Sequence, residues 1–145
     1  MKDIKVGLQL YSVREQLEAD MDATLEAVKK AGYDYVEFAN FYGRSAEQVK
    51  ELLDKHGLEC ISVHRRCEPF LADAELNIHE LKTVGARYCA IPWMSTDRQK
   101  GHAEYGIATD VIKKTSALLK ENGIQLMYLH QRVFHSDKKL ILGNL

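Results

Sequence analysis

The chain has 145 residues, of which 46% are hydrophobic and 28% charged, and its 20 Lys and Arg against 21 Asp and Glu give a net charge of −1. This length suits one domain with a buried core, so we expect a single domain over residues 1–145. The charge balance argues against a general nucleic-acid binder, and no apolar run approaches the roughly 18 residues of a membrane span.

Helical stretches and short apolar runs alternate along the chain. An apolar run at residues 4–11 predicts a first strand, and residues 140–142 could form a last short strand or a docked tail. Between them, helices are predicted at residues 21–31, 46–56, 73–84 and 105–121, followed by strands at 35–38, 60–63, 88–91 and 124–128. Each helix ends near a glycine, which tolerates the left-handed conformation that closes a helix. Strict alternation favours a parallel α/β sheet with right-handed crossovers.

The repeat implies a larger fold than the chain can complete. The four helix-ending glycines, Gly32, Gly57, Gly85 and Gly123, lie 25, 28 and 38 residues apart, about one strand–helix unit each. The chain therefore holds about four and a half units of a barrel that takes roughly 250 residues. We expect two open sheet edges, so that the chain is either a fragment of a longer product or pairs with a second copy.

Candidate functional residues lie where the predicted strands end, since strand-to-helix loops converge there in parallel α/β proteins. They are Gln9, Tyr11, Glu37, His64, Trp93 and His130. Side-chain alternation lets Gln9 share a face with Tyr11, and aims Glu37 at the interior, opposite to its two neighbours. On the third strand, alternation predicts that Cys60, Ser62 and His64 share the interior face, whereas Ile61 and Val63 face the helices.

Glu37 is the most informative of these residues. A carboxylate on an apolar strand costs several kcal/mol unless it is paired, protonated or metal-bound. A salt bridge to Arg14, Arg65 or Arg66 would satisfy it without any function. The neighbouring His64 is either a satisfied core histidine or a second site residue.

The other candidates have equally open roles. Trp93 could be packing or a pocket wall, and His130 a substrate contact or a surface residue. We assign both, with Gln9 and Tyr11, to substrate binding. The adjacent arginines Arg65 and Arg66 could bind phosphate or simply be exposed.

Four stretches resemble the sugar phosphate isomerase/epimerase family of xylose isomerase-like TIM barrels, which is related more distantly to endonuclease IV. They are residues 7–14 (GLQLYSVR), 32–38 (GYDYVEF), 63–64 (VH) and 123–128 (GIQLMY), and the resemblance runs in order from residue 4 to about 128. Members typically continue with His-Asn-His-Asp and an acidic residue, whereas this chain continues Leu129-His130-Gln131-Arg132.

The resemblance implies the N-terminal half of a (β/α)₈ barrel with catalytic positions at Glu37 and His64. The complete family site binds a divalent metal (Mn, Mg or Zn) and transfers a proton next to a carbonyl of a small sugar, sugar phosphate or polyol. Its metal ligands come largely from the later strands, so we assign no metal ligand here.

Two other functions stay open from the sequence. One is a non-catalytic half-barrel that dimerises or binds a partner, and the other is an apurinic-site nuclease, for which the charge count offers no basic groove. We expect a small-molecule partner, with neither nucleic acid nor membrane. Because the cysteines are odd in number without a CxxC pair, and the first residues lack a signal-peptide pattern, we expect a reduced, cytoplasmic location.

Overall fold

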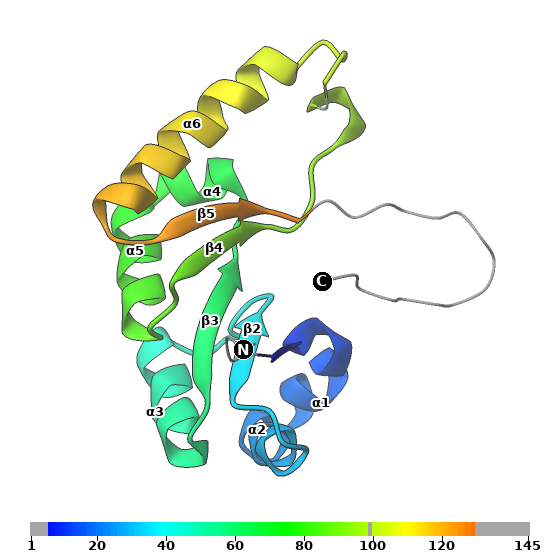
Figure 1. Cartoon of the computed structure of the whole chain (residues 1–145), viewed down its shortest axis with the longest axis vertical. Coiled ribbons are helices and arrows are strands. Elements are labelled where there is room, and N and C mark those ends of the chain that lie inside the picture. Colours follow the sequence, from blue (N-terminus) through cyan, green and yellow to red (C-terminus); the bar gives the residue numbers. More distant parts are fainter. Residues whose placement is uncertain (1–5, 99, 130–145) are drawn as a thin grey trace, which may run out of the picture.

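The computed structural model describes residues 6–98 and 100–129, which form a five-stranded parallel sheet in the order β1-β2-β3-β4-β5 (Figure 1). The strands are β1 (Gly7–Gln9), β2 (Tyr35–Phe38), β3 (Glu59–His64), β4 (Tyr88–Ile91) and β5 (Gln125–Tyr128). The helices are α1 (Arg14–Ala19), α2 (Met21–Lys30), α3 (Ala46–His56), α4 (Cys67–Ala72), α5 (Ala74–Thr83) and α6 (Tyr105–Glu121). Two 3₁₀ turns, η1 (Leu10–Val13) and η2 (Thr96–Arg98), complete the described elements. The predicted alternation of helices and strands is confirmed.

Local signals explain why the long helices end where the sequence predicted. At the start of α3 the Ser45 hydroxyl accepts from the backbone of Gln48, whose side chain accepts in return from the Ser45 backbone. This capping box satisfies backbone N–H groups that a helix start leaves unpaired. At the other end, Gly57 takes a φ of 65°, a left-handed conformation that favours glycine.

The core lies between the sheet and the helices that cover one of its faces. Figure 1 shows α3, α5 and α6 along the same side of the sheet. Within the core cluster, the fully buried strand side chains are Val36, Phe38, Val63 and Cys89, and the helices add Leu17, Met21, Leu25, Val49, Leu53, Phe70, Leu81 and Leu119. One sheet face is therefore packed, which leaves the other face, the inner one, to carry the polar side chains.

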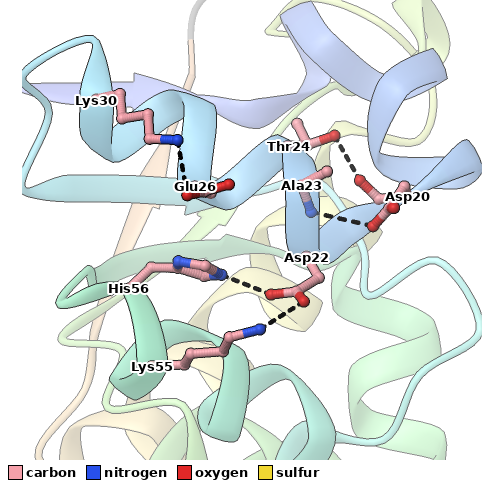
Figure 2. Close-up of polar contacts among 8 residues, drawn as sticks. All are labelled: Asp20, Asp22, Ala23, Thr24, Glu26, Lys30, Lys55 and His56. Atoms are coloured by element: carbon pink, nitrogen blue, oxygen red, sulfur yellow. Dashed lines mark hydrogen bonds and ion pairs between the residues drawn. The ribbon is translucent and has the colours of Figure 1, made fainter.

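Acidic side chains at the start of α2 connect it to α3 (Figure 2). Asp22 accepts from Lys55 Nζ at 2.6 Å and lies 2.6 Å from His56 Nε2, both at the end of α3. The hydrogen bonds from Lys55 and His56 lower the pKa of Asp22. Asp20 accepts from the backbone N–H of Ala23 at 3.0 Å and so caps α2. The contacts of Asp22 thus join α2 to α3, whereas the Asp20 cap lies within α2.

The first predicted strand is shorter than expected. Residues 10–13 turn into η1 instead of continuing β1, because Gln9 bonds locally at both its side chain and its backbone. Its Oε1 accepts from the Tyr11 backbone at 2.8 Å, and its carbonyl accepts from the Ser12 hydroxyl at 2.7 Å. Side chains of this kind compete with the strand ladder for backbone groups.

The predicted faces of β3 were partly wrong, because the strand contains a bulge. Val36 is opposite Cys60, but the next residue, Glu37, is opposite Ser62, so Ile61 is an extra residue. Cys60 therefore lies in the core cluster on the helix side and not on the inner face. Ile61 does not face the helices, because its Cδ1 lies beside Gly7 of β1, where an added Cβ would come within 3.3 Å of it. The prediction that Ser62 and His64 share the inner face holds, since the register places Ser62 beside Glu37 and His64 bonds to it.

The two outer strands of the sheet are β1 and β5, as the repeat predicted. The predicted strand at residues 140–142 lies outside the described residues. Among those described, no helix combines the length and the apolar character that crossing a bilayer requires.

Candidate functional site

Glu37 and His64 form a shielded hydrogen-bonded pair at the carboxyl ends of adjacent strands. Glu37 Oε1 lies 2.9 Å from His64 Nε2, and the two side chains are 17% and 9% exposed. Parallel strands β2 and β3 place both residues on the inner face, as the alternation of Glu37 with Val36 and Phe38 predicted. The predicted juxtaposition of these two residues is therefore present.

The protonation state of the pair follows from its surroundings. Burial would raise the pKa of Glu37, but the hydrogen bond from His64, aided by the neighbouring Ser62 hydroxyl, outweighs burial and lowers it. Glu37 is thus ionised at neutral pH, and a carboxylate only accepts hydrogen bonds. His64 Nε2 must then carry a hydrogen, and in the neutral imidazole this leaves Nδ1 as an acceptor, with no hydrogen bond to another described residue.

Ser62 adds a buried hydroxyl beside the carboxylate. It is 1% exposed and is the partner of Glu37 in the β2–β3 ladder. Its Oγ has no partner with hydrogen-bond geometry in the part of the chain that the structure describes. A buried hydroxyl without a partner costs free energy, so this atom is available to a bound molecule or to water.

Arg65 fixes the position of His64 from the opposite face. Its guanidinium donates to the His64 carbonyl at 2.9 Å, to Asn77 Oδ1 at 2.9 Å and to Glu80 Oε2 at 2.7 Å. It also lies 5.1 Å above the centre of the Phe41 ring. The next residue after an inward His64 points outward, toward α5, so alternation predicts the direction of the Arg65 side chain but not its partners.

The alternative that an arginine neutralises Glu37 was wrong. Arg65 is engaged by Glu80, and Arg14 lies 3.5 Å from Glu15. Arg66 is exposed and makes no ion pair with another described residue. The carboxylate is instead stabilised by His64.

The remaining candidates do not all join the pair. Gln9 is opposite Glu37 in the β1–β2 ladder, but its side-chain oxygen caps η1. Tyr11 lies in that turn, 55% exposed, with the Arg14 guanidinium 4.7 Å from its ring, so it does not share a strand face with Gln9. Trp93 lies beyond β4 and is 57% exposed. His130 lies outside the described residues.

The residues present do not fit a metal ion. Within residues 6–98 and 100–129, no group of three or more His, Cys, Asp or Glu side chains is arranged to hold one. Glu37 and His64 supply two donor groups that are already bonded to each other, whereas a catalytic zinc site takes three protein ligands.

Comparison with known proteins identifies the architecture. No family model and no curated protein matches the chain. A sugar phosphate isomerase/epimerase from Parabacteroides distasonis superposes with a TM-score of 0.72 at 21% identity, covering 88% of this chain and 51% of its own. The chain has the fold of about half a TIM barrel.

Other solved structures agree on this half-barrel. The IolI protein, solved with a bound zinc atom, gives a TM-score of 0.63 at 17% identity over 86% of this chain and 51% of its own. A family 2 AP endonuclease from Brucella melitensis gives 0.61 at 15% identity over 74% and 48%. The chain thus spans about half the length of these structures. At such low sequence identity, the likeness shows the fold alone.

Replacing Glu37 tests the electrostatics of the pair. Glu37→Gln should lower the free energy of unfolding at pH 7 by about 1–2 kcal/mol, because a charge-assisted hydrogen bond becomes a neutral one. Folding lowers the pKa of Glu37 below its ordinary value of 4.5. Its contribution to the free energy of unfolding is therefore fully present above pH 4.5 and is lost as the pH falls through the lower pKa of the folded state. Urea unfolding from pH 7 to pH 3 should therefore show a flatter acid dependence in the variant.

Glu59→Gln is the matched control, since Glu59 is an exposed carboxylate on β3 that lies 3.4 Å from Arg87. Equal unfolding free energies for wild type and Glu37→Gln at pH 7 would show that the pair does not stabilise the sheet.

Proposed function

We propose that the inner face around Glu37 and His64 binds a small sugar, sugar phosphate or polyol, as part of a site for isomerisation or epimerisation. The observation that carries this proposal is the shielded 2.9 Å hydrogen bond between the two residues. It lies at the carboxyl ends of parallel strands, where TIM-barrel enzymes build their sites. The likeness to a sugar phosphate isomerase/epimerase supports the substrate class.

The acceptor pattern of the pair suits adjacent hydroxyl groups. One carboxylate oxygen of Glu37 is occupied by His64, which leaves Oε2 able to accept one substrate O–H. His64 Nδ1 can accept a second. The Ser62 hydroxyl, which lies beside the carboxylate, can accept from a third substrate hydroxyl. A polyol chain supplies several hydroxyls, whereas an apolar ligand would leave all three atoms unsatisfied.

The two residues differ in the chemistry that they can perform. A general base works best when its pKa is near the working pH, so the lowered pKa of Glu37 makes it a poor proton acceptor. We assign Glu37 to orienting the imidazole and one hydroxyl. His64, with a free Nδ1, is the better group to take or return a proton next to a substrate carbonyl.

Sugar binding by this chain tests the assignment. D-xylose, D-fructose and D-fructose 6-phosphate would be titrated while saturation-transfer NMR follows the sugar protons. We expect millimolar binding by the wild type, weakened about tenfold or more by Glu37→Gln, since losing one charged acceptor costs at least 1.4 kcal/mol.

The chain offers a control with the same chemistry on its surface. Glu47 Oε1 lies 2.8 Å from His79 Nε2, but these side chains are 56% and 60% exposed on α3 and α5. Glu47→Gln should leave sugar binding unchanged. If Glu37→Gln binds all three sugars as tightly as the wild type, the site is elsewhere.

We further propose that a second copy of the chain covers the outer strands. A twofold axis along the barrel would place β5 of one copy beside β1 of the other, and all strands would stay parallel. The pairing would give the edges of β1 and β5 ladder partners and enclose the inner face.

Light scattering after size exclusion should then give twice the chain mass of 16.5 kDa. A mass of one chain at micromolar concentration would contradict the pairing, while the assignment of Glu37 and His64 would still stand or fall with the sugar titration.

A further inference from the structure

A cavity lies between α4, the start of α6 and the end of β4. Its volume is about 530 Å³, within the range of small-molecule sites. Ile91, Ala108, Val111 and Ile112 give it an apolar floor, and Trp93 stands at its rim. Figure 1 shows the long loop that leaves the end of β4 and leads to the start of α6.

This cavity is on the other side of the sheet from Glu37 and His64. Ala90 is the ladder partner of His64, and the following residue, Ile91, lines the cavity. Because successive strand side chains point to opposite faces, Ile91 faces away from the side on which His64 lies. The cavity is therefore separate from the proposed sugar site.

Charged side chains at the cavity mouth differ in their pairing. Arg98 forms ion pairs with Glu68 and with Glu104, the latter at 3.1 Å, so three of the charged groups neutralise one another in part. Arg66 also lines the cavity, yet its guanidinium makes no hydrogen bond or ion pair with another described residue. Among the described residues that line the mouth, Arg66 is thus a cation whose hydrogen-bonding capacity is unused.

We propose that this cavity binds a small organic anion, a carboxylate or phosphate monoester carried on a flat apolar body. The planar guanidinium of Arg66 matches both anions with two parallel N–H donors. The floor from β4 and α6 would cover the apolar body, and the Trp93 ring would stack against it at the rim. A neutral ligand of the same shape would gain the apolar contacts only.

Trp93 supplies the measurement, because it is the one tryptophan in the sequence. Its fluorescence would be followed during titration with 3-phenylpropionate and phenyl phosphate, with 3-phenylpropan-1-ol as the neutral analogue. We expect saturable changes with both anions and at least about tenfold weaker binding of the alcohol.

Two variants separate the charge from the cavity. Arg66→Ala, at an exposed position, should weaken both anions about tenfold, while Arg87→Ala, an exposed arginine that does not line the cavity, should have no effect. Ala108→Phe should fill the cavity and abolish the response to anions and alcohol alike.

The proposal would be overturned if Arg66→Ala bound the anions as tightly as the wild type does. It would also be overturned if the wild type bound the alcohol as tightly as it binds the anions. If Ala108→Phe fails to fold, the Arg66→Ala comparison still decides. These outcomes are independent of the sugar titration, which reports on the opposite face of the sheet.

Discussion

The cost of placing a carboxylate on a parallel sheet explains most of the inner face. An ionised Glu37 needs hydrogen-bond donors that the strand backbone cannot spare, since the ladders to β1 and β3 use those groups. His64 supplies one at 2.9 Å, and burial of both side chains keeps water from competing. The Glu37 carboxylate therefore lies hydrogen-bonded to the His64 imidazole and fixes its orientation.

The bulge at Ile61 makes this arrangement possible. In an unbroken ladder Glu37 would be opposite Ile61, since Val36 is opposite Cys60. The extra residue brings Ser62 opposite Glu37, and His64 follows on the same face. A bulge next to a polar pair is a common way for a sheet to redirect side chains, and here it puts a serine where an isoleucine would have stood.

Much of this could be predicted from the sequence, for identifiable reasons. The capping box and Gly57 mark the ends of α3, and side-chain phase alone places Glu37 on the inner face. The bulge could not be predicted, because no residue near Ile61 signals an extra position. The η1 turn was missed because Gln9 ends the strand through its own side chain, which strand propensity does not reveal.

The surroundings of two site residues, Arg65 and Trp93, could be predicted only in part. Arg65 could not be assigned from the sequence, because its partners Asn77 and Glu80 come from a helix whose orientation was unknown. Trp93 was predicted as packing or a pocket wall and assigned to substrate binding, and it lines a cavity on the helix side of the sheet. A strand end alone does not specify on which face the next residues lie.

The tautomer of His64 is the most direct test of the account, since every proposed role of the pair depends on it. A long-range ¹H–¹⁵N spectrum at pH 7 should show His64 with its hydrogen on Nε2 and an unprotonated Nδ1. The preference for the Nε2 hydrogen should weaken in Glu37→Gln, where the acceptor is no longer charged. A wild-type His64 that is protonated on Nδ1, or that averages between both tautomers, would contradict the account.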